Sequence, residues 1–187
     1  MLPPVDAVSG SLPLGRFGAE LAEIKATFVE APEWAGSTSR AAIWNDFESA
    51  TAGIQSIIPV AWVWLGGSFI SNKLDPDDID VVYWCEDRFV DRITDPQEKY
   101  ILQLFATNQV RAQTKLRVDT RICRWHVFPE ATQQRTIEHN AYSADRGYWD
   151  DLWLRKRSGA KTDPPVRDDA LPRRGYAEVM LDGLYVV

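Results

Sequence analysis

The sequence predicts a single α/β domain, because a long amphipathic helix and three strand-like apolar runs alternate along one chain of 187 residues. A chain of this length builds one well-packed core and leaves little material for a second. Apolar residues make up 45% of the chain and charged residues 26%, which is typical of a folded globular protein rather than a disordered one. We therefore expect residues 1–187 to form one domain.

The N-terminal region is expected to hold an arm and a short helix. Residues 1–15 are rich in Pro, Gly and Ser, which favours an irregular arm. Leu21, Ile24 and Phe28 recur at helical spacing, so a short helix is predicted from Gly18 to Val29.

A long amphipathic helix is predicted from Arg40 to Ile58, where Pro59 ends it. Its apolar positions form one stripe: Ile43, Phe47, Ala50, Ile54, Ile57 and Ile58. A second helix is predicted to open at Asp95, which can cap it, because Pro96 suits the first helical position.

Three strands are predicted in the middle of the chain. Residues 60–65 and 78–85 are almost continuous apolar runs of β-forming residues, which indicates strands buried on both faces. Residues 115–125 alternate in the manner of a third strand.

The signal weakens beyond Pro129, so residues 130–187 are interpreted as an extension packed on the core. A short helix is expected around Tyr148 to Trp153, and the proline-containing segment 158–174 is expected to be a loop. Residues 177–181 are expected to form a closing strand.

Charge and composition exclude some classes of function. The net charge is -6 and the pI is about 5.0, which argues against a broad, non-specific grip on DNA. No signal segment or apolar run of membrane-spanning length is found, so we expect a soluble cytoplasmic protein without a membrane partner. Cys85 and Cys123 fall in predicted strands and are expected to be buried free thiols.

A glycine-serine turn carries the first chemical signal. Gly66, Gly67 and Ser68 directly follow the predicted strand 60–65. Two glycines let the backbone turn sharply and approach a ligand closely. Backbone N–H groups and a serine hydroxyl at such a turn form a donor set suited to phosphate.

Two acids in the second predicted strand carry the next signal. Side chains alternate along a strand, so Asp78 and Asp80 are expected on the same face, about 7 Å apart. Buried together, two carboxylates repel each other unless a cation compensates them. A hard divalent ion, Mg²⁺ or Mn²⁺, is the natural partner for such oxygen ligands.

Asp119 in the third predicted strand is a candidate third metal ligand or general base. Arg117 and Arg121 flank it on the same face and are candidates to contact phosphates. The alternative is that these three residues form an exposed salt-bridge ladder. Without the other motifs, this pattern would favour the ladder over a site.

The glycine-serine turn followed by Asp78-Ile79-Asp80 resembles the signature of the nucleotidyltransferase superfamily, in its small single-domain bacterial form. The resemblance implies a mixed β-sheet with flanking helices and a nucleoside triphosphate (NTP) substrate. It also implies that Gly67 and Ser68 bind the phosphates, while Asp78, Asp80 and Asp119 bind two Mg²⁺ ions. A basic residue often follows the serine in that family, a part that only Lys73 can play here.

Residues 12–15 and 172–179 extend this resemblance to a family of uncharacterised nucleotidyltransferase-like bacterial proteins. The implied activity moves a nucleoside monophosphate from an NTP to a hydroxyl of a tRNA end, a protein or a small molecule. A toxin–antitoxin or phage-defence context is implied as well. The alternative is a catalytically inactive module that binds a nucleotide or a protein, and the oligomeric state stays open.

Basic runs also lie near aromatic residues in the C-terminal third. Residues 155–157 with Lys161, and Arg173 with Arg174, are interpreted as a solvated surface in preference to an RNA contact. His126 and His139 lack ligand-spaced neighbours, so they are interpreted as ordinary core or surface histidines.

Overall fold

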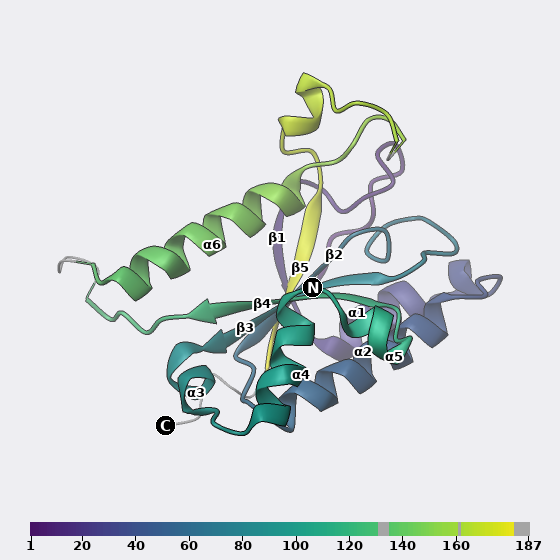
Figure 1. The fold of residues 1–187 in the computed structure, drawn as a ribbon. Coiled ribbons are helices and arrows are strands. Elements are labelled where there is room, and N and C mark those ends of the chain that lie inside the picture. Colours follow the sequence, from purple (N-terminus) through teal and green to yellow (C-terminus); the bar gives the residue numbers. More distant parts are fainter. Residues whose placement is uncertain (131–134, 161, 182–187) are drawn as a thin grey trace.

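The computed structural model describes residues 1–130, 135–160 and 162–181, and in these it contains one five-stranded mixed sheet with flanking helices (Figure 1). The strand order is β1-β5-β2-β3-β4, in which β1–β5 and β3–β4 are parallel pairs and the others antiparallel. The strands are β1 (Gly15–Ala19), β2 (Trp62–Gly66), β3 (Ile79–Glu86), β4 (Val118–Trp125) and β5 (Gly175–Met180). The expectation of a mixed α/β architecture is confirmed.

Helices lie on both sides of this sheet (Figure 1). They are α1 (Leu21–Lys25), α2 (Arg40–Gln55), α3 (Asp87–Arg92), α4 (Pro96–Ala106), α5 (Val110–Thr114) and α6 (Ile137–Leu154). A π-helical turn η1 (Ala26–Glu30) and the 3-10 turns η2 (Pro32–Trp34) and η3 (Arg167–Ala170) complete the set. Within the described residues, no helix has both the length and the apolar character needed to cross a membrane.

The central elements are close to their predicted positions. β2 is buried along its whole length and β3 at all but one position, as expected for strands covered on both faces. The predicted N-cap is also confirmed, because the Asp95 carboxylate accepts hydrogen bonds from the backbone N–H groups of Gln97 and Glu98. β4 begins at Val118 instead of residue 115, since Lys115 adopts a left-handed conformation (φ 68°) after α5.

The N-terminal prediction was wrong at one point. Gly18 does not begin a helix, because residues 15–19 form β1 and the helix starts at Leu21. Among the described residues, β1 pairs only with β5, whose residues lie at the other end of the chain. The local sequence does not predict β1, because the hydrogen bonds that stabilise this strand come from the distant partner strand β5.

The C-terminal region contributes more than an extension. β5 lies inside the sheet, between β1 and β2. α6 runs from Ile137 to Leu154, much longer than the short helix expected around Tyr148. The first half of α6 is polar, so its sequence shows no helical repeat of apolar residues. The Thr136 hydroxyl caps the helix by accepting a hydrogen bond from the backbone N–H of His139.

The two faces of the sheet differ in what covers them. We call one the apolar face; it packs against α1, α2, α4 and α5 through Val63, Leu65, Val81, Tyr83 and Val118. We call the other the tryptophan face; it packs against α6 through Trp62, Trp64, Val82, Trp84 and Tyr176. Because side chains alternate along each strand, the same strands supply both faces.

Candidate functional site

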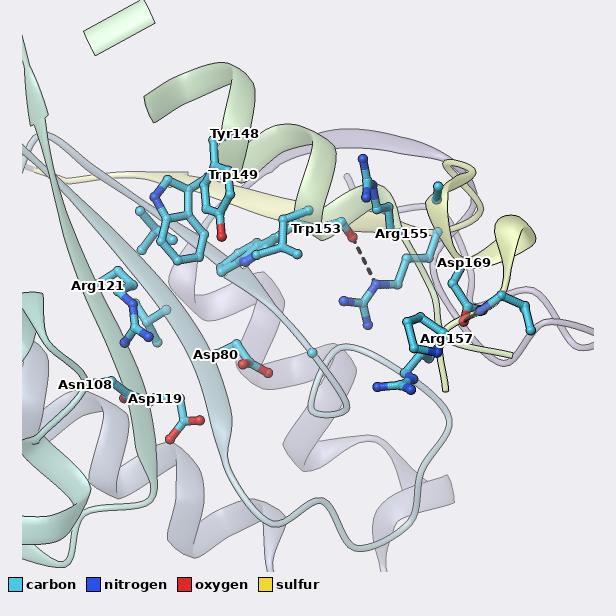
Figure 2. A pocket seen from close by; sticks show the side chains of 18 residues that line it. Asp80, Asn108, Asp119, Arg121, Tyr148, Trp149, Trp153, Arg155, Arg157 and Asp169 are labelled. Atoms are coloured by element: carbon cyan, nitrogen blue, oxygen red, sulfur yellow. Dashed lines mark hydrogen bonds between the residues drawn. The ribbon is translucent and has the colours of Figure 1, made fainter. Parts of the chain in front are cut away.

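Two of the predicted acids lie side by side on the tryptophan face. Asp80 on β3 is the register partner of Asp119 on the parallel strand β4. Asp80 shares a face with Val82 and Trp84, because all three occupy alternate positions of β3. Neighbouring strands lie roughly 5 Å apart, so two carboxylates paired in this way are direct neighbours. Figure 2 shows both in the same cavity.

Gly67 is placed directly against one of these carboxylates. It follows β2 with φ 72°, a conformation that side chains other than that of glycine rarely adopt. A Cβ atom at this position would lie 1.6 Å from Oδ2 of Asp80. Only glycine at position 67 therefore leaves room for the Asp80 carboxylate. This close approach explains why the predicted turn contains a glycine at this position.

A cavity of about 630 Å³ opens in front of the two carboxylates (Figure 2). Its wall combines acids, basic residues and aromatic rings. The lining residues that carry these groups are Asp80, Asp119, Asp169, Arg121, Arg155, Arg157, Arg174, Tyr148, Trp149 and Trp153. A ligand bound there would meet groups that favour cations and groups that favour anions within one open cavity.

Asp78 is placed differently from the other two acids. It precedes β3, which begins at Ile79, so strand alternation does not fix the direction of its side chain. Its Oδ2 accepts a hydrogen bond of 2.5 Å from the Arg111 guanidinium on α5. Within the described residues, no group of three or more His, Cys, Asp or Glu side chains could hold a metal ion. The expected trio of acids is therefore a pair, with Asp78 bound to Arg111.

The residues after Gly67 turn away from the cavity. Neither Ser68 nor Lys73 is among the residues that line it. The Ser68 carbonyl accepts a hydrogen bond of 2.6 Å from the Ser71 hydroxyl, and the Lys73 ammonium forms an ion pair with Asp77 at 3.0 Å.

Arg40 of α2 fixes this segment. Its buried guanidinium donates hydrogen bonds to the backbone carbonyls of Phe28, Phe69, Ser71 and Lys73, at 2.5–2.9 Å. Burial lowers the pKa of Arg40 to about 10, which leaves it protonated at neutral pH. The turn is therefore tied to the N-terminal helices by charge-assisted hydrogen bonds.

The two arginines that flank Asp119 are separated in the structure. Arg117 precedes β4, and its Nε donates to Asp46 of α2 at 3.2 Å. Arg121 lines the cavity, donates to the Thr120 carbonyl at 2.7 Å and lies 5.9 Å from the centre of the Trp149 ring. Because Arg117 pairs with Asp46 rather than with Asp119, the alternative of a three-residue salt-bridge ladder is not formed.

The sequence did not predict the arginines that line the cavity on the side across from Asp80 and Asp119. Arg155, Arg157 and Arg174 line the cavity although they were interpreted as solvated surface. Lys161, grouped with them, lies outside the described residues. The one available signal was that these arginines lie near Trp149 and Trp153 in the sequence; their meeting in space depends on the insertion of β5 into the sheet.

Arg174 connects the two walls electrostatically. Its Nε donates to the Trp153 carbonyl at 2.9 Å, the bond dashed in Figure 2. Burial lowers the pKa of the Arg174 guanidinium below its ordinary value, and the negative charge of Asp80 opposes that shift. Arg174 thus lies within electrostatic reach of Asp80.

Asn108 contributes a further polar group beside Asp119. It has a left-handed backbone conformation (φ 58°), and its Oδ1 accepts a hydrogen bond of 2.8 Å from the backbone N–H of Thr120. That bond satisfies a donor on β4 and leaves the side-chain N–H₂ group of a cavity-lining residue as a donor for a ligand.

The carboxylate pair suits a hard divalent cation that is shared with a ligand. Mg²⁺ is commonly held by one or two carboxylates together with substrate phosphates, and it keeps several waters. Asp80 and Asp119 supply that donor set, and Gly67 leaves the room that the Asp80 carboxylate needs. Without a third protein carboxylate in the group, we expect a cation to bind more tightly in the presence of a phosphate ligand.

Comparison with known proteins yields one match. No curated protein and no solved structure matches the chain. A family described only as of unknown function, DUF6932, matches residues 3–180 and thus includes the sheet, α6 and the described cavity. The chain belongs to the DUF6932 family.

Proposed function

We propose that this protein is a metal-dependent nucleotidyltransferase that moves a nucleoside monophosphate from an NTP to a hydroxyl acceptor and releases pyrophosphate. The observation that carries the proposal is the register pairing of Asp80 with Asp119 in a cavity that also holds arginines and aromatic rings. The volume of about 630 Å³ lies within the range of sites for ligands of nucleotide size.

Electrostatics explains why a metal-bound nucleotide suits this cavity. Two neighbouring carboxylates repel each other, and a divalent cation between them and a phosphate relieves that repulsion. When bound there, Mg²⁺ would neutralise charge that develops on the phosphates during transfer. Asp80, backed by Gly67 and near Arg174, is the carboxylate best fixed to hold it.

Asp119 is assigned the second role in this proposal. It lies on β4, the outer strand of the sheet, beside the polar side chain of Asn108. From there its carboxylate can accept the proton of an acceptor hydroxyl, a function that needs a group within hydrogen-bond reach of the attacking oxygen. The acceptor is a tRNA end, a protein side chain or a small molecule.

The second candidate function is a module that binds a nucleotide or a protein without catalysis. One observation favours it: Asp78, the first acid of the motif, is paired with Arg111. A site with two carboxylates instead of three can retain nucleotide binding while lacking the groups that catalysis needs. The two candidates share the ligand site and differ in turnover.

Binding is tested first, by thermal unfolding with Mg²⁺ and each NTP. A ligand at 100 times its dissociation constant stabilises the native state by about 2.7 kcal/mol. We expect such a shift in the wild type and its loss in Asp80→Asn and Asp119→Asn. Asp91→Asn is the matched control, because Asp91 forms an exposed ion pair with Arg124 away from the cavity. Equal shifts in all variants would contradict the site.

Turnover is tested with NTPs labelled at either the α or the γ phosphate, incubated with tRNA, cell lysate or the protein itself. Transfer of a nucleoside monophosphate moves the α label and not the γ label to the acceptor. Nucleotide binding that depends on Asp80 and Asp119, without transfer of the α label to any acceptor, would favour the non-catalytic module.

A further inference from the structure

We propose that Arg155, Arg157 and Arg174 form the phosphate-binding wall of this cavity, in place of the turn from Gly67 to Lys73. The inference rests on the proposed function, because it deepens the assignment of the same cavity to a nucleotide. It assigns the triphosphate to two residues in the segment that follows α6 and to one residue directly before β5.

The turn is poorly placed for that task. Gly67 lies against the Asp80 carboxylate, which would repel a phosphate brought to the same spot. The carbonyls of Phe69, Ser71 and Lys73 accept hydrogen bonds from Arg40, and Lys73 itself pairs with Asp77. The turn therefore supports a carboxylate and is bound to the N-terminal helices.

The arginines, by contrast, converge on the cavity from two chain segments. The backbone N–H groups of Arg173 and Arg174 both donate to the Leu154 carbonyl, at 2.7 and 3.0 Å. Arg155 and Pro172 form an isolated β-bridge at the same place. These contacts set the end of α6 beside the start of β5, and Arg155, Arg157 and Arg174 all line the cavity. Figure 2 labels Arg155 and Arg157 there.

The segment between these arginines is held by its own acids. The Asp169 carboxylate accepts hydrogen bonds from the backbone N–H groups of Ser158 and Val166, at 2.7 and 3.0 Å. Those hydrogen bonds lower the pKa of Asp169 below its ordinary value. The Asp163 carboxylate likewise accepts from the backbone N–H of Ala160. A segment organised before binding loses less conformational entropy when a ligand arrives.

Each arginine is also positioned by one internal contact. Arg155 pairs with Asp151, Arg157 donates to the Asp163 carbonyl, and Arg174 donates to the Trp153 carbonyl. A guanidinium has five N–H donors in a planar fork, so one such contact orients the group and leaves other donors for a ligand. Arginine forks match phosphate oxygens in a bidentate manner.

The sign of the charge is divided across the cavity. Asp80 and Asp119 form its negative side on β3 and β4. Arg121 on β4 offsets part of that charge, whereas the three arginines outnumber Asp169 on the other side and make it net positive, in a protein whose net charge is -6. A polyphosphate that carries a divalent cation has the complementary distribution of charge. Its cation would face the carboxylates, and its outer phosphate oxygens would face the arginines.

The test measures the binding of Mg²⁺-tripolyphosphate and Mg²⁺-NTP by calorimetry, because tripolyphosphate has no base or sugar. We expect Arg157→Gln and Arg174→Gln each to weaken both ligands at least tenfold, and Arg157→Lys to keep part of the affinity. Lys73→Gln and Arg117→Gln are matched controls that remove a positive charge outside the cavity. They should leave both affinities within twofold of the wild type.

The outcomes separate this inference from the proposed function. If Lys73→Gln weakens NTP binding while the arginine variants bind normally, the phosphate wall is wrong and the nucleotidyltransferase proposal survives. Tripolyphosphate binding that needs the arginines, without any transfer of the α label, would keep the wall and contradict the transferase. Should Arg174→Gln fail to fold, Arg157→Gln decides alone, because Arg157 is exposed and tolerates substitution.

Discussion

The two faces of the sheet are built from the same strands and yet do different things. α1, α2, α4 and α5 close the apolar face, where side chains such as Phe47, Ile54 and Tyr83 are fully buried. The tryptophan face is covered by α6 (Figure 1), and a cavity opens beside that helix (Figure 2). The apolar face therefore holds the larger core cluster, whereas the tryptophan face combines a smaller buried cluster with the proposed chemistry.

Tryptophan suits the second face because it combines a large ring with a polar N–H group. Trp62 stacks on Trp84 with ring centres 5.7 Å apart, and the Trp64 indole N–H donates to Glu178 at 2.6 Å. The Arg146 guanidinium of α6 lies 5.5 Å from the Trp64 ring centre. Rings of this kind fill space and still tolerate neighbouring charges, which aliphatic side chains do not.

The largest expected effect on stability is on the apolar face. Phe47→Ala removes a fully buried ring that packs 5.1 Å from Trp44, centre to centre, and should cost about 3–5 kcal/mol of unfolding free energy. Leu152→Ala is the counterpart on the cavity side; its side chain is 39% exposed and should cost less than about 1 kcal/mol. Urea unfolding measures both, and comparable losses would show that the faces do not differ in stability.

Gly67→Ala is expected to lower both the stability of the protein and its affinity for Mg²⁺-NTP. A left-handed conformation costs a residue with a side chain about 1–2 kcal/mol, and the new Cβ would displace the Asp80 carboxylate. We expect a loss of that size in unfolding free energy and at least a tenfold loss of Mg²⁺-NTP affinity. Gly53→Ala, in α2 with open space around it, should instead stabilise by up to about 1 kcal/mol. Retained Mg²⁺-NTP affinity in Gly67→Ala would argue against Asp80 as a metal ligand.

Trp149→Ala tests the aromatic part of the cavity through its effect on ligand affinity. Stacking of a base on an aromatic side chain contributes about 1–3 kcal/mol, so NTP affinity should fall about 5- to 150-fold. Tripolyphosphate affinity should not change, and Trp149→Phe should recover most of the NTP affinity. Equal weakening of both ligands by Trp149→Ala would mean that the ring supports the wall rather than a base.

Local sequence was informative where the motif lies inside regular structure. Asp80 and Asp119 fall within strands that were recognisable from their composition, and both line the cavity. Asp78 and Arg117 lie just before β3 and β4, where alternation no longer applies, and each is paired with a helix instead. Strand boundaries therefore decided which candidates line the cavity.

The sequence alone determined the central strands, the long helix α2, the glycine turn and the two acids beside it, because apolar periodicity and backbone preference act over a few residues. Only the tertiary structure decided the rest. β1 and β5 pair although almost the whole chain lies between them in sequence. The place of β5 inside the sheet brings α6, and the arginines that follow it, close to the carboxylates. The physical reason is that strand pairing satisfies backbone hydrogen bonds without regard to distance along the sequence, so no local pattern records it.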